Sequence, residues 1–339
     1  MDISKLVDTA QAMVGEGHGI LAIDESQGTI KKRFDGVGVE STEDNRRNYR
    51  SALLTTPGLG DHISGAILFD ETLRQSTPDG RPLVQVMQEA GIIPGIKVDK
   101  GAKALAGHPG EKVTEGLDGL RERFAEYSDL GARFAKWRAV IGIGEDIPTS
   151  ACIEANAHAL ARYAALAQES DLVPIVEPEV LMNGNHDLDT AYEVTEATLR
   201  AVFNQLFDQG VVFEGTVLKA SMVISGDQAS DRAGVEEVAD ATLSCLLNTV
   251  PAAVAGIVFL SGGQDDQEAT AHLDAMNRMG DFPWPLSFSF GRALQQAALK
   301  TWSQNMDQPE KCQKVLKHRA EMNGLAAMGQ YDPEQDKVA

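Results

Sequence analysis

Residues 173–180 read VPIVEPEV, a short apolar run that ends in two carboxylates. Runs of this kind, brief and rich in Val, Ile and Phe, recur along the 339-residue chain between longer polar segments. Gly, Pro or Asp flanks them, as is typical of strands buried on both faces of a parallel sheet. The other runs are Gly19–Asp24, Ile63–Phe69, Ile92–Val98, Phe134–Ile141, Gly215–Val223, Gly256–Gly263 and Pro285–Gly291.

The segments between these runs carry helical periodicity. The stretch Asp187–Gln209 places apolar residues along one face, and Thr149 is suited to cap a helix that runs to about Ser170. Eight strands that alternate with helices predict an α/β fold, a single (β/α)8 TIM barrel over 1–339. We expect an extra N-terminal helix over 1–15, and a C-terminal helix and tail over about 306–339. An open doubly wound sheet is the alternative, but its usual Gly-rich fingerprint after the first strand is missing.

Composition and charge restrict the classes of partner. The chain has 30 Lys and Arg against 50 Asp and Glu, a net charge of −20, which disfavours nucleic acid and anionic membranes as partners. No apolar stretch approaches the ~20 residues that span a bilayer, and the N-terminus has no signal-peptide pattern. Cys152, Cys245 and Cys312 lie far apart, which favours a reducing, cytoplasmic location.

Metal-binding spacing is absent from the seven histidines. His186 stands near Asp187 and Asp189, a group that imitates metal ligands, but the pattern favours a solvated turn that enters a helix. We therefore predict no metal site and no cofactor.

Charged residues interrupt the predicted strands where apolar side chains are expected. Because side chains alternate along a strand, Lys136 and Arg138 share a face, and so do Glu177 and Glu179. In a barrel, one such set points inside, near the C-terminal mouth where catalytic groups of this fold lie. Buried ion pairs without chemistry are the alternative, but burying so many ions is costly unless a function requires them. The full set is Asp24, Lys97, Lys136, Arg138, Glu177, Glu179 and Lys219.

The lysines in this set point to amine chemistry. A neighbouring cation and partial desolvation both disfavour an ammonium group, so they lower a lysine pKa and free a nucleophilic amine. Such an amine forms a Schiff base with a carbonyl, while adjacent carboxylates move protons. The residues alone leave Lys219 and Lys136 nearly equal as the nucleophile.

Two loops after the last predicted strands have the character of phosphate cradles. Ser261-Gly262-Gly263 follows the seventh strand, and Ser289-Phe290-Gly291-Arg292 follows the eighth and opens a helix. Loops at these positions commonly bind phosphate through backbone N–H groups. A second anion site is indicated by Ser26 and Thr29 with the basic run 31–33, although these residues also suit a helix cap and a solvated face. Two phosphate sites around a Schiff-base lysine predict a substrate that has a carbonyl group and two phosphates.

Seven motifs, in order along the chain, give the sequence a family resemblance. Over approximately residues 10–330 it resembles class I fructose-1,6-bisphosphate aldolase. The motifs are LAIDES (21–26), GIKVDKG (95–101), FAKWR (134–138), VPIVEPE (173–179), LK (218–219), LSGGQ (260–264) and GRAL (291–294).

The resemblance implies a role for each candidate residue. Lys219 is the Schiff-base lysine, Glu177 the principal acid and base, and Glu179 holds the lysine network, with Asp24 and Lys136 beside the reacting carbons. The implied phosphate contacts are Ser261, Gly262, Gly263, Ser289, Gly291 and Arg292 at the C1 end, and Ser26, Thr29, Arg33, Lys97 and Arg138 around the other end and the anionic substrate. It also implies metal-independent cleavage to dihydroxyacetone phosphate and glyceraldehyde 3-phosphate in glycolysis and gluconeogenesis, and a homotetramer.

The chain departs from the family pattern at three places. No Pro-Asn pair follows Lys219, and Phe290 stands where a tyrosine is common in the family. Many relatives carry a C-terminal tyrosine that assists protonation of the enamine intermediate at C3. In this sequence Tyr331 is the last tyrosine, so the group that protonates C3 is unassigned. Three alternatives stay open: another ketose bisphosphate such as sedoheptulose 1,7-bisphosphate, a catalytically weak sugar-phosphate binder, and a metal-dependent aldolase.

Overall fold

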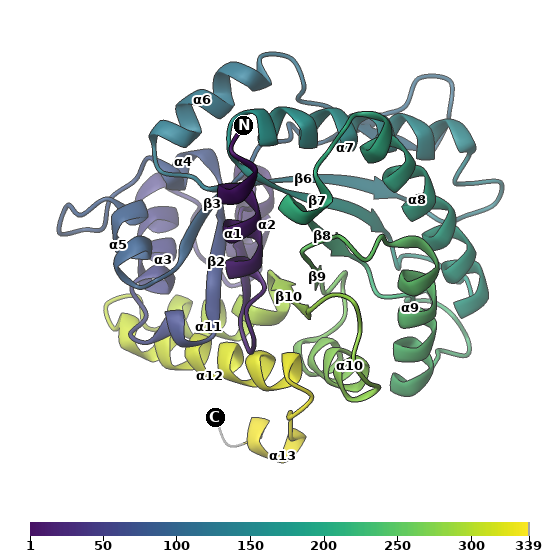
Figure 1. The fold of residues 1–339 in the computed structure, drawn as a ribbon. Coiled ribbons are helices and arrows are strands. Elements are labelled where there is room, and N and C mark those ends of the chain that lie inside the picture. Colours follow the sequence, from purple (N-terminus) through teal and green to yellow (C-terminus); the bar gives the residue numbers. More distant parts are fainter. Residues whose placement is uncertain (338–339) are drawn as a thin grey trace.

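A computed structural model describes residues 1–337 and contains a closed barrel of eight parallel strands (Figure 1). Around the barrel the strand order is β1-β10-β9-β8-β7-β6-β3-β2. This confirms the predicted fold, and the open-sheet alternative is wrong. The strands are β1 (Gly19–Ile23), β2 (Ile63–Leu68), β3 (Ile93–Lys97), β6 (Phe134–Ile141), β7 (Val173–Val180), β8 (Val217–Ala220), β9 (Gly256–Phe259) and β10 (Leu286–Phe290).

Several strands are shorter than the sequence predicts. Asp24 lies just beyond β1, and residues 261–263 lie in the loop after β9. A short β-hairpin of β4 (Ala102–Ala104) and β5 (Lys112–Thr114), which the sequence analysis does not predict, follows β3. The mouth of the barrel is therefore built from loops as well as from strand ends.

Helices surround the barrel, and side chains cap several of them. The Thr149 side chain accepts a hydrogen bond from the Cys152 N–H, and Asp187 accepts one from the Thr190 N–H, which confirms both predicted helix starts. The helices after the first are α2 (Gln27–Asp35), α3 (Glu43–Leu54), α4 (Asp70–Leu73), α5 (Leu83–Glu89), α6 (Leu120–Asp129), α7 (Ser150–Glu169), α8 (Leu188–Asp208), α9 (Val235–Thr249), α10 (Asp266–Arg278), α11 (Arg292–Gln304), α12 (Pro309–Ala327) and α13 (Pro333–Asp336), with 3-10 turns at Leu59–Asp61 and Phe213–Gly215.

The N-terminal helix α1 (Ile3–Met13) closes one end of the barrel (Figure 1). Its Leu6, Ala10 and Met13 are buried against apolar side chains of the strands. The Phe134 ring fills the same region so tightly that a Cβ at Gly95 would lie 2.1 Å from it. Glycine is therefore required at position 95. The barrel interior at this end is therefore filled by apolar side chains.

The C-terminal segment is more ordered than the predicted polar tail. Tyr331 is buried, and its hydroxyl donates to an Asp336 carboxylate oxygen at 2.8 Å. The Arg278 guanidinium donates to the Tyr331 carbonyl oxygen, so this segment is held beside the end of α10. The last two residues of the predicted tail, 338 and 339, lie outside the described residues. No helix within 1–337 is long and apolar enough to cross a membrane.

Candidate active site

A cavity of about 970 Å³ opens at the C-terminal ends of the strands. Strands β1, β3, β6, β7, β8 and β10 and the loops after β9 and β10 contribute to it. With one exception, the predicted site residues line this cavity. These are Asp24, Ser26, Thr29, Arg33, Lys97, Lys136, Arg138, Glu177, Glu179, Lys219, Ser261, Gly262, Ser289, Gly291 and Arg292.

The exception is Gly263, which is exposed and does not contact the cavity. Its φ of +116° is a conformation that favours glycine, and a Cβ here would lie 3.6 Å from an Arg292 guanidinium nitrogen. Gly263 therefore shapes the loop beside Arg292, and a direct contact between Gly263 and a phosphate stays a prediction.

Two lysines and two carboxylates meet at the centre of the cavity. Lys136 Nζ lies 2.7 Å from Asp24 Oδ2 and 3.1 Å from Glu177 Oε2. Lys219 Nζ lies 3.1 Å from Glu177 Oε1, so Glu177 stands between the two lysines. Lys136, Glu177 and Lys219 are each buried. The four groups form a chain of charges with proton acceptors beside both amines.

The strands place these groups without any irregular backbone. Lys136 is on β6, Glu177 on the neighbouring β7 and Lys219 on β8, and all three side chains point inside the barrel. Asp24 joins them from the end of β1, far away in the order around the barrel. Closure of the barrel is thus what brings Asp24 within hydrogen-bonding distance of Lys136.

The electrostatics of Lys136 differ from the sequence prediction. Burial opposes its charge, but the carboxylates of Asp24 and Glu177 outweigh that cost and raise the pKa of Lys136 above its ordinary value. The expectation that clustered lysines lower one another's pKa is wrong for Lys136. Opposite charges at hydrogen-bonding distance dominate here, and spacing along the sequence did not reveal them.

The carboxylates are held ionised by the same contacts. Burial acts to raise the pKa of Glu177, but Lys136, Lys219 and Arg138 together lower it. For Asp24, burial is again overcome by Lys136 and Lys219, and its pKa falls well below the ordinary value. In the free protein, both groups are therefore ready to accept a proton.

Two further ion pairs flank the centre. The Arg138 guanidinium contacts the Glu179 carboxylate, and Lys97 Nζ lies 2.6 Å from Asp99 Oδ1. Asp99 is buried and also accepts hydrogen bonds from the N–H groups of Gly101 and Arg138. Asp99 was not among the predicted site residues, because it lies in the loop two residues beyond β3.

One end of the cavity carries the predicted cradle after β10. The Ser289 hydroxyl is buried and has no hydrogen-bond partner among residues 1–337, although it lines the cavity. Gly291 precedes α11, and Arg292 is the first residue of that helix. A buried hydroxyl, a helix N-terminus and a guanidinium together suit an anion.

The other end carries the predicted second anion site. Ser26 Oγ lies 3.2 Å from Thr29 Oγ1, and the Ser26 side chain makes no capping hydrogen bond to α2. Arg33 contacts the Glu25 carboxylate, which also accepts a hydrogen bond from Gln295 Nε2 at 2.6 Å. The capping alternative for Ser26 is therefore not what the structure shows.

Basic residues that the site prediction left out also line the cavity: Lys32, Lys100 and Lys103. The basic residues of the run 31–33 do not all belong to the site. Lys31 Nζ lies 2.6 Å from Asp35 Oδ2 on the solvated side of α2, whereas Lys32 lines the cavity. Lys100 was visible in the motif at 95–101, but nothing in the sequence showed that the chain beyond it turns back as a hairpin.

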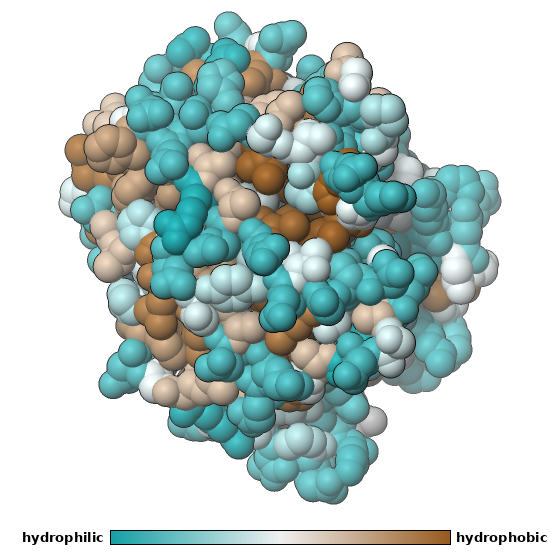
Figure 2. Space-filling view, turned by 90° about the vertical axis from the view of Figure 1, so that its right-hand side faces the viewer, coloured by the Kyte–Doolittle hydropathy of each residue, from teal (hydrophilic) through white to brown (hydrophobic). Residues whose placement is uncertain are grey.

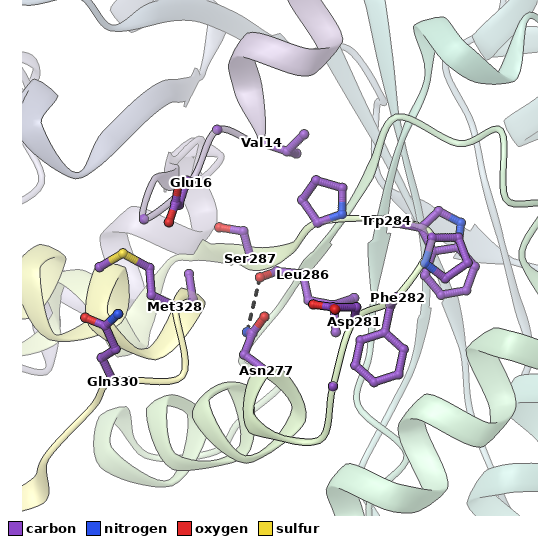
Figure 3. A pocket seen from close by; sticks show the side chains of 16 residues that line it. Val14, Glu16, Asn277, Asp281, Phe282, Trp284, Leu286, Ser287, Met328 and Gln330 are labelled. Carbon is purple, nitrogen blue, oxygen red and sulfur yellow. Dashed lines mark hydrogen bonds between the residues drawn. The ribbon is translucent and has the colours of Figure 1, made fainter.

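A second cavity, of about 430 Å³, lies at the opposite end of the barrel (Figure 3). Two of its side chains donate to main-chain oxygens: Asn277 Nδ2 donates to the carbonyl of Leu286 at 3.2 Å, and the Trp284 indole donates to that of Pro251 at 2.9 Å. No ion pair lies among its lining residues within 1–337. Nor is any group of three or more His, Cys, Asp or Glu in the described chain arranged to hold a metal ion.

Comparisons with known proteins agree over nearly the whole chain. A family model described as glycolytic, class-I fructose-bisphosphate aldolase matches residues 5–339. A probable class 1 fructose-bisphosphate aldolase from Xanthomonas campestris is 66% identical over 332 residues, covering 98% of this chain and 99% of the relative. Fructose-bisphosphate aldolase 1 from Toxoplasma gondii is 52% identical, covering 96% of this chain and 91% of the relative.

A solved structure agrees as closely. It is a fructose-bisphosphate aldolase from Plasmodium falciparum, in complex with TRAP and a small-molecule inhibitor. It has 47% sequence identity and a TM-score of 0.96, and the match covers 97% of this chain and 95% of that one.

Proposed function

The chain belongs to the class I fructose-bisphosphate aldolase family, and from that membership we propose which of its residues carry out each step. The reaction is the reversible cleavage of fructose 1,6-bisphosphate through a lysine Schiff base, without a metal ion. The enzyme is a lyase of glycolysis, and the products are dihydroxyacetone phosphate and glyceraldehyde 3-phosphate.

Lys219 is the nucleophile. Its Nζ transfers a proton to Glu177, which lies 3.1 Å away, and then attacks the C2 carbonyl of the substrate. Glu177 returns the proton to the carbinolamine hydroxyl, which leaves as water and gives an iminium ion. Lys136 is held as a cation by Asp24 and Glu177, so it stabilises charge and does not compete as the nucleophile.

Cleavage of the C3–C4 bond needs a base for the C4 hydroxyl proton, and we assign Asp24. Its pKa is lowered by Lys136 and Lys219 against the effect of burial, so it is ionised at neutral pH. The bond electrons flow into the iminium and form an enamine, as the aldehyde product leaves. Protonation of the enamine at C3 and hydrolysis of the Schiff base then return Lys219 and release dihydroxyacetone phosphate.

The remaining candidates bind the two phosphates. We assign Ser261, Gly262, Ser289, Gly291 and Arg292 to the C1 phosphate, with Gly263 shaping the loop. Ser26, Thr29, Arg33 and Lys97 take the other phosphate, Arg138 favours the anionic substrate, and Glu179 holds Arg138 in place. The observation that supports the C1 assignment best is the buried, unpartnered Ser289 hydroxyl.

The contact that carries the mechanism is the one between Lys219 and Glu177. Borohydride reduction in the presence of dihydroxyacetone phosphate, followed by peptide mass spectrometry, tests it directly. We expect a reduced adduct on Lys219 that forms equally with EDTA. An adduct on Lys136 would support Schiff-base chemistry but would make Lys136, and not Lys219, the nucleophile. Cleavage without any adduct would contradict the Schiff-base route.

Assembly and location are further parts of the proposal. We propose a homotetramer, tested by light scattering. Phe207 and Leu247, near the C-terminal ends of the neighbouring helices α8 and α9, are 75% and 53% exposed. The face on this side of the molecule shows hydrophobic residues between hydrophilic ones (Figure 2), as a subunit contact requires. All three cysteines are free and buried, which supports a cytoplasmic enzyme, and we propose that 1–339 folds as one domain.

A further inference from the structure

The carboxylates that line the active-site cavity are all neutralised within it. Five acidic side chains line the cavity, and each lies beside a cation that lines it too. The pairs are Asp24 with Lys136, Glu25 with Arg33, Asp99 with Lys97, Glu177 with Lys219, and Glu179 with Arg138. The positive potential of the cavity must therefore come from the cations left over.

Those cations are Arg292 and three lysines at the edge of the cavity. Lys32, Lys100 and Lys103 are exposed, line the cavity and take part in none of the ion pairs formed among residues 1–337. The chain as a whole carries a charge of −20. An anionic substrate is thus repelled by most of the surface and attracted at this edge.

Lys103 owes its position to the β4–β5 hairpin. In this antiparallel pair Lys103 is opposite Val113, and Lys112 is opposite Ala104. Opposite residues share a face of the ladder and adjacent residues alternate, so Lys103 and Lys112 lie on different faces. Lys103 lines the cavity, as does Ala102, whereas Lys112 does not. The hairpin therefore carries two exposed lysines, of which Lys103 lines the cavity and Lys112 does not.

We propose that Lys100 and Lys103 form a substrate-attracting rim that lowers KM for the bisphosphate without taking part in the chemistry. They lie on the chain just beyond Lys97, so their charge acts on the phosphate remote from C1. This inference rests on the proposed function, because it requires a substrate with a second phosphate at that end.

The expected size of the effect follows from screened Coulomb attraction. A unit charge about 10 Å from a phosphate, in largely aqueous surroundings, changes KM by roughly two- to fourfold at low ionic strength. The screening length is about 30 Å at 0.01 M salt and about 3 Å at 1 M. The contribution of the rim is therefore present in dilute buffer and lost in concentrated salt.

The test compares Lys103→Gln with Lys112→Gln, a matched change of charge on the same hairpin. For fructose 1,6-bisphosphate at low salt, we expect Lys103→Gln to raise KM roughly two- to fourfold with unchanged kcat, and the double variant with Lys100→Gln to raise it further. Lys112→Gln, whose lysine does not line the cavity, should raise KM by clearly less than Lys103→Gln. The differences disappear at high salt, and they are smaller for fructose 1-phosphate, which lacks the second phosphate.

The rim is refuted if Lys103→Gln matches Lys112→Gln at low salt, if its KM increase persists at high salt, or if kcat falls while KM stays constant. Each of these results requires an active wild-type enzyme. Failure of the proposed function is a separate observation, because the wild type then neither cleaves the bisphosphate nor gives a trapped adduct on Lys219.

Discussion

The two ends of the barrel each contain a cavity, but they differ in how their polar groups are satisfied. At the N-terminal end, Asn277 donates to the carbonyl of Leu286 (Figure 3), Trp284 donates to that of Pro251, and the described residues that line the cavity form no ion pair with one another. At the C-terminal end, Lys136, Glu177 and Lys219 are buried and form ion pairs with one another and with Asp24. A hollow by itself does not indicate a site, whereas buried charges that pair across different strands do.

The difference has a structural cause. Apolar side chains of helix α1 pack against the starts of the strands, so the barrel interior at this end has no space for a buried ion. At the other end, side chains from strand ends and loops converge around open space, and the loops differ in length and chemistry. Changes at the two ends should therefore have different consequences, for catalysis at one and for stability at the other.

The largest effect is expected for Lys219→Ala. Without the amine no Schiff base forms, so we expect cleavage to fall by roughly four orders of magnitude or more, as when other covalent nucleophiles are removed. Binding of the bisphosphate, measured by calorimetry, stays close to wild type because both phosphate ends are intact. Trp284→Phe at the opposite end serves as the control and should retain full activity. Unchanged cleavage in Lys219→Ala would contradict the assignment of Lys219 as the nucleophile.

A smaller loss is expected for Asp24→Asn. The amide keeps the shape but cannot accept the C4 hydroxyl proton, so kcat for cleavage should fall roughly 10²- to 10⁴-fold. Borohydride trapping of dihydroxyacetone phosphate on Lys219 should persist, because that step does not break a C–C bond. If trapping is lost together with cleavage, Asp24 acts at Schiff-base formation and our division of roles between Asp24 and Glu177 is wrong.

The two ends of the barrel should also differ in how acid affects the free energy of unfolding. The pKa of Glu177 is lowered in the folded protein, so its contribution to stability is present above the ordinary carboxyl pKa of 4.5 and is lost as pH falls through the folded value. We expect chemical denaturation to show a steeper loss of unfolding free energy below about pH 5 in the wild type than in Glu177→Gln. Asp281→Asn, at the exposed edge of the other cavity, should follow the wild-type slope. Equal slopes for wild type and Glu177→Gln would contradict the ionised state inferred for the site.

The smallest catalytic effect is expected for Asn277→Ala. Its side chain donates to the carbonyls of Leu273, Leu286 and Ala326, and their loss should destabilise the fold by about 1–3 kcal/mol. Thermal unfolding measures that change, while KM and kcat at moderate temperature should equal those of the wild type. A marked change in KM would mean that the two ends of the barrel are coupled.

The strands, most of the helices and the central charges were accessible from the sequence. A buried parallel strand is a short apolar run, and a charge within it is conspicuous, so Lys136, Glu177 and Lys219 were identifiable by position alone. Helix caps at Thr149 and Asp187 are equally local signals. Such features depend on residues that are neighbours along the chain, and the sequence records these directly.

Other features depended on residues that are distant along the chain. The raised pKa of Lys136 follows from Asp24, which only closure of the barrel brings within 2.7 Å, and sequence spacing suggested the opposite sign. Asp99 and Lys103 belong to a loop and a hairpin whose course the apolar pattern did not encode. The sequence thus determined which groups carry charge and on which strands they lie. Tertiary structure decided which charges meet, because electrostatic energy depends on distance in space and not on separation along the chain.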